Sequence, residues 1–322
     1  MAFCLEKEHD VQLFVHQPVL LEEVIAVLDS HDGGAYVDAT VGGGGHAEKI
    51  LQACAPGGRL IGIDRDEDAL AAAREKLAPY GERVCLFHAN FRDLDRILRQ
   101  VGVTQVDGIL FDLGLSSPQV DQAARGFSYR KTGPLDMRMD QHQLFSAYDL
   151  VNEWPQERLA AIFRTYGEER YATSIAKAIV AHRQKAPIRE TGELDQIVRE
   201  GLPPHLRQRA APSKRVFQAI RIAVNDELSA LRQGLEAGFR WLAPQGRMVV
   251  LSFHSLEDRL VKQFFAEMAS GCTCPPDFPV CVCGRKPQMR LLLKKPLTAS
   301  EAEVERNPRA HSAKLRAAVK TG

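Results

Sequence analysis

The sequence predicts an α/β fold with a Rossmann-like parallel sheet that an all-helical insertion interrupts. Short β-like runs alternate with helical patterns in the first third of the chain, and a glycine-rich loop follows the first of these strands. The alternation then stops for about 100 residues before it resumes. We therefore expect residues 1–113 and 214–322 to form the sheet domain, and residues 114–213 to form the inserted helical domain for substrate recognition.

Four strands are expected before the insertion, and helical patterns separate them. The strands are expected at 35–38, 59–64, 83–88 and 106–112. The helices are expected at 46–53, 67–77 and 93–101. Helices of this length between strands supply the crossovers that parallel strands require.

The insertion is expected to contain helices and no strand. Its helical patterns lie at 155–165, 172–184 and 193–201, and Gly and Pro signals separate them. One long helix over 215–242, a strand over 246–253 and a helix over 255–268 then resume the alternation. Two further runs, 289–294 and 313–319, are expected to form an antiparallel edge.

Composition excludes several classes of protein. The 322 residues include 42 Lys plus Arg and 41 Asp plus Glu, a net charge of +1, with 45% hydrophobic residues. This balance argues against a polybasic nucleic-acid wrapper and against an acidic disordered chain. The chain has no apolar run that could span a membrane, and its first ten residues are too polar for a signal peptide. With seven cysteines, three of them scattered, we expect reduced or metal-bound thiols and a cytoplasmic location.

The glycine-rich loop predicts a nucleotide-like ligand. Gly42, Gly44 and Ala47 fit the G-x-G-x-x-G/A pattern between a strand and a helix, where glycines let the backbone turn sharply and approach a ligand. Asp64 ends the next strand, 20 residues after Gly44, and a carboxylate there can accept both ribose hydroxyls. The alternative is a glycine turn that only permits tight packing.

Two cofactors share this geometry, a nicotinamide dinucleotide and S-adenosylmethionine. A dinucleotide needs a second phosphate-binding half, and nothing after residue 114 supplies one. Asp38, at the end of the first strand, would repel a pyrophosphate and suits a cationic amino-acid ligand. The sequence therefore favours S-adenosylmethionine.

The chain closely resembles the MraW family of bacterial 16S rRNA cytidine-N4 methyltransferases. The resemblance covers about residues 16 to 320 and rests on motifs throughout that range. They are His16-Gln-Pro-Val-Leu-Leu-Glu-Glu-Val24, Gly42–His46, Gly62-Ile-Asp-Arg-Asp66, Phe111-Asp-Leu-Gly-Leu-Ser-Ser-Pro-Gln119, Arg125-Gly-Phe-Ser128, Gly133-Pro-Leu-Asp-Met-Arg-Met-Asp140, Tyr166-Gly-Glu-Glu-Arg170, Val216-Phe-Gln-Ala-Ile-Arg221, Ser252-Phe-His-Ser-Leu-Glu-Asp-Arg259 and Asn307-Pro-Arg-Ala-His-Ser312.

The resemblance implies a class I S-adenosylmethionine-dependent methyltransferase with an inserted helical domain. It also implies the substrate, a cytidine in the decoding region of 16S rRNA in the small ribosomal subunit, methylated on its exocyclic N4. The matching motifs place the cofactor contacts at Gly44, Gly45, His46, Asp64, Phe91, Asp112 and Gln119.

Asp112 and His254 are the candidate catalytic residues. Asp112 ends the fourth strand, where an acceptor for the target amine belongs, but it also suits the methionine amine of the cofactor. The Asp/Asn-Pro-Pro-aromatic motif of many amino-methyltransferases is replaced here by Asp112-Leu-Gly-Leu, so its roles do not transfer. His254 follows the fifth strand and is a better active-site histidine than His46, although a structural role is an equal alternative. For Phe91, the alternative to a cofactor contact is a structural role in the hydrophobic core.

Basic residues at the end of the insertion and in the C-terminal tail are the candidate RNA contacts. Residues 203–221 hold five bases and no acid, and residues 284–322 hold ten bases and three acids. The five are Arg207, Arg209, Lys214, Arg215 and Arg221. The alternative for each stretch is a solvated charged face. Phe127 and Tyr129 are candidates for stacking on a base.

Four cysteines, Cys272, Cys274, Cys281 and Cys283, are close enough in sequence to hold zinc. Their spacing is not a common finger, so we favour unligated thiols and expect no metal. Two other functions remain open, a nicotinamide dehydrogenase and a non-catalytic RNA-binding scaffold. Binding of NAD without S-adenosylmethionine would favour the first, and absence of turnover the second. The sequence is compatible with a monomer or a homodimer.

Overall fold

A seven-stranded sheet forms the centre of the protein. The computed structural model describes residues 18–208, 211–271 and 286–322, together with residues 274, 278, 280, 283 and 284. The strand order is β3-β2-β1-β4-β5-β7-β6. The strands are β1 (Ala35–Asp38), β2 (Arg59–Asp64), β3 (Val84–His88), β4 (Val106–Asp112), β5 (Leu242–Ser252), β6 (Met289–Leu291) and β7 (Lys314–Lys320).

The pairing of the strands confirms the predicted Rossmann-like sheet. β3, β2, β1, β4 and β5 pair in parallel, whereas β7 runs antiparallel to both β5 and β6 and forms the predicted edge. β5 begins four residues before its predicted start, and β6 ends three residues early. The chain leaves β1 toward β2 on one side and returns on the other side at β4. Such a reversal opens a crevice at the carboxyl ends of the strands.

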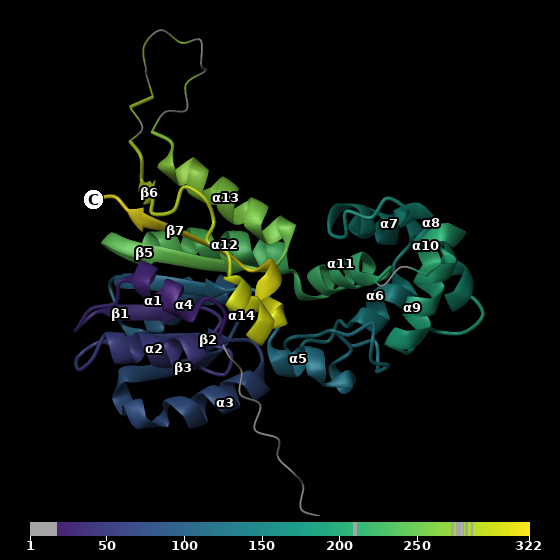
Figure 1. Ribbon diagram of the computed structural model, residues 1–322, viewed down its shortest axis with the longest axis horizontal. Coiled ribbons are helices and arrows are strands. Elements are labelled where there is room, and N and C mark those ends of the chain that lie inside the picture. The colour runs from purple at the N-terminus through teal and green to yellow at the C-terminus, as the bar shows by residue number, and fades with distance from the viewer. Residues whose placement is uncertain are drawn as a thin grey trace, which may run out of the picture.

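Helices cover both faces of the sheet (Figure 1). Side chains alternate along a strand, so each strand contributes to both faces of the sheet. On one face, Val37 and Ile109 pack with the helices α4 (Leu94–Val101), α12 (Glu227–Trp241) and α13 (Ser255–Ala269). Tyr36 and Leu110 face the opposite side. The helices of that side are α1 (Leu21–Leu28), α2 (Gly45–Ala53) and α3 (Glu67–Leu77).

Short helices occur in the loops of the sheet domain and at the start of the insertion. They are the 3₁₀ turns Ala78–Arg83, Phe91–Asp93, Ala123–Arg125 and Pro308–Ser312, and α14 (Glu301–Arg306). The predicted helices 46–53, 67–77, 93–101 and 255–268 agree with the observed ones within one residue at each end. α1 was not predicted.

The insertion lies beside the sheet and has its own hydrophobic core, which includes Phe163, Ile175 and Leu194 (Figure 1). Its helices are α5 (Ser117–Asp121), α6 (Ala147–Glu153), α7 (Gln156–Thr165), α8 (Ala172–Arg183), α9 (Thr191–Glu200) and α10 (Pro204–Arg207). No strand occurs in the described part of residues 114–213, as predicted.

The prediction of one long helix over 215–242 is wrong. The segment forms two helices, α11 (Lys214–Asn225) and α12, which meet at Asp226 in the left-handed conformation with φ +48°. Local periodicity does not reveal the break because both helices are amphipathic and no Gly or Pro separates them. α11 packs its buried face, including Phe217 and Ile220, into the core of the insertion. We therefore propose Asp226, rather than Ser213, as the boundary of the insertion.

A buried ion pair anchors the insertion to the sheet domain. Asp66 caps α3 by accepting the N–H of Asp68, and its second carboxylate oxygen lies 3.0 Å from Nη2 of Arg125. Both side chains are about 5% exposed. The same oxygen accepts a hydrogen bond of 2.6 Å from Gln119 Nε2. Arg125 also donates to the carbonyls of Arg138 and Met139, so one side chain joins two segments of the insertion to α3.

Replacing Arg125 by methionine is expected to lower the free energy of unfolding by about 3 kcal/mol, because it leaves the buried Asp66 carboxylate without its cation. Urea unfolding followed by circular dichroism measures the change. Arg96→Met is the matched control, since the Arg96 side chain is 65% exposed and its loss is expected to cost less than about 0.5 kcal/mol. Equal losses in the two variants would contradict the anchoring role.

Candidate functional site

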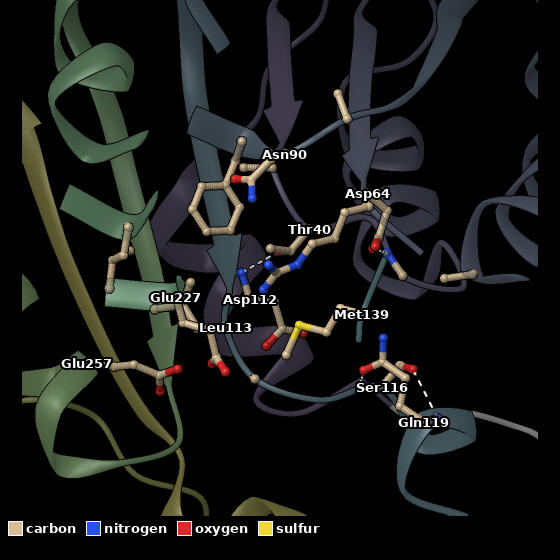
Figure 2. A pocket seen from close by; sticks show the side chains of 18 residues that line it. Thr40, Asp64, Asn90, Asp112, Leu113, Ser116, Gln119, Met139, Glu227 and Glu257 are labelled. Carbon is tan, nitrogen blue, oxygen red and sulfur yellow. Dashed lines mark hydrogen bonds between the residues drawn. The ribbon is translucent and has the colours of Figure 1, made fainter. Parts of the chain in front are cut away.

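A pocket lies in the crevice at the carboxyl ends of β1 to β4. Its lining comes from the loops after these strands, from α12 and α13, and from the insertion. Figure 2 shows Asp64 and Asn90 across the pocket from Glu227 and Glu257, with Met139 and Gln119 of the insertion along a third side.

Asp64 and Gly42 form the part of the pocket that the sequence predicted from the glycine loop. Oδ2 of Asp64 accepts the N–H of Gly42 at 2.8 Å, and Oδ1 accepts the N–H of Asp66 at 2.9 Å. Burial raises the pKa of Asp64, although these two hydrogen bonds act in the opposite direction. A carboxylate has about four acceptor positions, so two remain for a pair of hydroxyls. Gly42 has φ +51°, a conformation that favours glycine.

Phe91 lines the pocket and belongs to the core at the same time. Its ring is 8% exposed and meets Phe111 edge to face at 5.7 Å between centroids. The adjacent Asn90, which caps the 3₁₀ turn after β3, also lines the pocket. Phe91 therefore has the predicted core position, and its predicted contact with the cofactor stays a prediction.

Gly44, Gly45 and His46 are not among the residues that line the pocket. Gly44 caps α2 with φ +82°, and a Cβ on Gly45 would lie 2.4 Å from Pro18. His46 is 5% exposed, with Nε2 3.1 Å from the carbonyl oxygen of Val19 and Nδ1 3.3 Å from Oδ2 of Asp112. These three residues therefore support the glycine-rich loop without lining the pocket.

Both ring nitrogens of His46 face oxygen acceptors, so the arrangement favours the doubly protonated ring. Burial alone would lower the pKa of His46, but the hydrogen bond and the charge of Asp112 raise it above its ordinary value. His46 therefore fixes one oxygen of the Asp112 carboxylate. Asp112 lines the pocket, and its backbone N–H donates to Oγ1 of Thr40 at 2.6 Å.

Gln119 reaches the pocket from the insertion. Its side chain is 4% exposed, and its amide donates to Asp66 at 2.6 Å while its oxygen accepts the N–H of Ser116 at 3.0 Å. Both ends of the amide are thus occupied. Gln119 closes the pocket and connects it to the anchor at Asp66.

The opposite wall consists of two carboxylates that the sequence analysis did not identify, Glu227 and Glu257. Arg221 binds Glu227 in a bidentate ion pair, with both N–O distances 2.8 Å. Glu257 is 3% exposed, and Oε2 accepts the N–H of Phe253 at 2.9 Å and of His254 at 3.2 Å. Burial would raise the pKa of Glu257, but His254 and Arg221 lower it below its ordinary value.

His254 lies behind Glu257 and is not among the residues that line the pocket. Nδ1 accepts the N–H of Glu257, and Nε2 lies 3.1 Å from Oε1 of the same residue. The pair forms a capping box at the start of α13. Glu257 could have been identified from its position three residues after His254, which follows a strand, because this spacing is typical of a capping box at the start of a helix.

The predicted RNA contacts that the structure describes differ in exposure and in their partners. The guanidinium of Arg221 is 14% exposed and occupied by Glu227, which argues against contact with RNA. Arg207 donates to the carbonyls of Leu202 and Glu200 in its own loop. Lys214 and Arg215 are exposed and line a second hollow. Arg209 lies outside the described residues.

Basic residues of the C-terminal tail and the two aromatic candidates for base stacking also make contacts within the protein. Lys314 and Arg316 of β7 both bind Asp258 of α13, at 3.2 and 2.6 Å. Phe127 is 8% exposed in the core of the insertion, and Tyr129 packs edge to face on Phe217. These contacts argue against Phe127 as a stacking platform for a base.

Two of the four cysteines considered as zinc ligands lie outside the described residues. Cys274 and Cys283 are described, but Cys272 and Cys281 are not, so the expectation of unligated thiols stays a prediction. None of the helices in the described ranges has the length and apolarity that crossing a membrane requires.

Comparison with known proteins identifies relatives along almost the whole chain. Ribosomal RNA small subunit methyltransferase H of Heliobacterium modesticaldum is 54% identical over 310 residues, which cover 96% of this chain and 99% of the relative. The protein of the same name from Symbiobacterium thermophilum is 53% identical over 95% of this chain and 97% of the relative.

Two solved structures also align with the chain. An rRNA methylase from Streptococcus thermophilus is 12% identical with a TM-score of 0.41 over 94% of both chains. A SAM-dependent O-methyltransferase from Thermotoga maritima is 11% identical with a TM-score of 0.40, covering 94% of this chain and 64% of the other. The family model described as MraW methylase family matches residues 13–321. The chain therefore belongs to the MraW methylase family.

Proposed function

We propose that the protein methylates 16S rRNA of the small ribosomal subunit at the exocyclic N4 of a cytidine in the decoding region. S-adenosylmethionine is the methyl donor. The observation that carries the proposal is the pocket, in which Asp64, the carboxylate expected to bind the ribose hydroxyls, lies across from the acidic wall formed by Glu227 and Glu257. The names of the relatives, which refer to the RNA of the small subunit, support the substrate.

The charge of the pocket fits a cationic cofactor. Asp64, Asp112, Glu227 and Glu257 line it together with one arginine, Arg65. S-adenosylmethionine carries a sulfonium and an ammonium, which carboxylates stabilise, whereas the pyrophosphate of a dinucleotide would be repelled. The acidic lining therefore favours the methyltransferase over the dehydrogenase. We assign Asp64 to the ribose, Asn90 and Phe91 to the adenine, and Asp112 to the amino group.

The contact with His46 supports one of the two roles considered for Asp112, that of a cofactor contact. The imidazole of His46, 3.3 Å from Oδ2, holds the Asp112 carboxylate in a fixed orientation, which suits an acceptor for an ammonium group. We assign Asp112 to the cofactor and His46 to positioning it. The acceptor for the target amine then has to come from another wall of the pocket.

Glu257 is the group that we assign to this acceptor role. The lone pair of cytosine N4 is delocalised into the ring, so an acceptor must orient the amine, and the N4 proton becomes acidic once the methyl group is attached. A carboxylate with a low pKa is adequate for that proton. His254, in contact with Oε1 of Glu257, holds the carboxylate in place as a positioning residue.

The direct test incubates the protein with radiolabelled S-adenosylmethionine and small ribosomal subunits. We expect the label in N4-methylcytidine of 16S rRNA after digestion to nucleosides and chromatography. Glu257→Gln keeps the size of the side chain and is expected to lower kcat more than about tenfold, a larger change than its effect on cofactor affinity. The surface variant Glu75→Gln is the control. Label on another base, or no label in RNA, would contradict the proposal.

Replacing His46 by glutamine is expected to weaken S-adenosylmethionine binding about tenfold, because Asp112 loses its charged hydrogen-bond donor. Isothermal titration calorimetry measures the affinity. His142→Gln is the control, since His142 is 68% exposed and its ring binds Glu67 outside the pocket. If kcat fell while cofactor affinity stayed unchanged, Asp112 would act on the amine instead.

Asp38 is expected to make stability depend on pH. It is 1% exposed, and burial raises its pKa to about 7. Between the unfolded value and about 7 the folded state holds a proton that the unfolded state has lost, so stability falls as pH rises through this range. Asp38→Asn removes this titration and is expected to gain up to about 1.4 kcal/mol per pH unit relative to the native protein. Urea unfolding at pH 5 and pH 8 measures it, and a difference that does not vary with pH would refute it.

A further inference from the structure

A second hollow lies within the insertion, where the turn between α7 and α8 meets the segment before α11. Arg170 and Tyr171 come from the turn, and His205, Lys214 and Arg215 come from the other side. Leu202, which is 5% exposed, contributes an apolar surface to the same hollow. None of these residues lines the first pocket.

The rim of this hollow has an excess of positive charge. Arg170, Lys214 and Arg215 are exposed, and within the described ranges neither Arg170 nor Lys214 has an ion-pair partner. The one carboxylate of the lining, Glu169, is 7% exposed and accepts the N–H of Tyr171 at 2.9 Å. The formal charge of the lining is therefore +2 (three cations, one carboxylate), with His205 neutral.

The carboxylate of Glu168, the residue before Glu169, makes its hydrogen bonds outside the hollow. The carboxylate of Glu168 binds Arg259 at 2.8 Å and accepts from the Ser255 hydroxyl at 3.3 Å. Arg215 donates to the backbone oxygen of Glu168 at 3.2 Å, not to its carboxylate. These contacts leave Arg170 and Lys214 available for an anionic ligand.

The hollow combines this cationic rim with apolar and aromatic surface. Leu206 and Pro212 line it beside Leu202, and Tyr171 is half-buried there. A phosphate attracts the rim, and the flat face of a base suits tyrosine and aliphatic side chains. An inorganic anion would use only the first feature.

We propose that this hollow binds a nucleotide of the RNA substrate, next to the segment that contains the target cytidine. Arg170 and Lys214 contact the phosphate, and Tyr171 contacts the base. The inference rests on the proposed function, because it assumes that RNA is the substrate. α11 connects the two sites: Lys214 begins the helix, and Arg221 binds Glu227 at the wall of the first pocket. Seven residues of helix span roughly 10 Å.

The test measures binding of a fluorescein-labelled single-stranded RNA oligonucleotide by anisotropy at several salt concentrations. Replacing both Arg170 and Lys214 by alanine is expected to weaken binding at least about tenfold and to reduce the slope of log K against log salt by about 1.4, about 0.7 for each phosphate contact of a single strand. Affinity for S-adenosylmethionine should not change, since neither residue lines the first pocket.

Lys177→Ala with Lys185→Ala is the matched control. Both lysines are exposed, lie on or just after α8, and do not line the hollow. Equal losses in the two double variants would overturn the proposal, because they would reflect net charge alone. Arg170→Lys with Lys214→Arg should keep the salt slope. Lys214→Gln alone, expected to remove half of the slope change, tests the site if the double variant melts early.

A free-nucleotide site and an RNA site are distinguished with cytidine monophosphate. If the monophosphate binds as tightly as the oligonucleotide, the hollow is a nucleotide-effector site and the proposal is wrong. The binding assay needs no turnover. A protein that binds RNA through this hollow but methylates no cytidine would therefore refute the proposed function and leave the site in place.

Discussion

The buried contact between Asp66 and Arg125 is the interaction on which the functional site depends. Asp66 lies two residues after Asp64, and its backbone N–H is one of the two that hold the Asp64 carboxylate. The same residue caps α3 and binds Gln119 and Arg125 of the insertion. The same turn of the chain therefore positions both the Asp64 carboxylate and Gln119, which closes the pocket. Displacing the insertion would remove Gln119 and Met139 from the pocket and loosen Asp64 at the same time.

The break between α11 and α12 makes a second connection of the same kind. The side chain of Asn225 donates to the carbonyl of Met137 and accepts the N–H of Met139, while its backbone oxygen accepts from Arg65 at 2.9 Å. Glu227 follows two residues later on the pocket wall. A continuous helix could not direct α11 into the insertion and α12 onto the sheet. The left-handed Asp226 is thus a requirement of the two-domain arrangement, and not a local preference of the sequence.

Sequence patterns predicted what depends on local order and failed where the structure depends on long-range pairing. Asp64, Phe91 and Asp112 line the pocket because residues at or just after the ends of parallel strands meet at one edge of the sheet, and their roles stay predictions. Glu227 and Glu257 were missed because only the folded chain brings them to the same wall. Arg221 was assigned to RNA because residues 203–221 contain no acid, whereas its partner Glu227 lies beyond that stretch, after the break at Asp226. Arg209, Cys272 and Cys281 lie outside the described residues, so those predictions stand unchanged.

The net charge of +1 has a physical explanation in these pairings. Arg125 and Arg221 bind carboxylates inside the protein, and Lys314 and Arg316 of the basic tail share Asp258. Arg221, Lys314 and Arg316, which sequence counting assigns to RNA, therefore bind carboxylates within the protein. An enzyme that contacts few phosphates gains little sequence-independent affinity, because each contact releases about one counterion. If the proposed RNA site is correct, its selectivity comes from the shape of the RNA that the hollow and the pocket reach together.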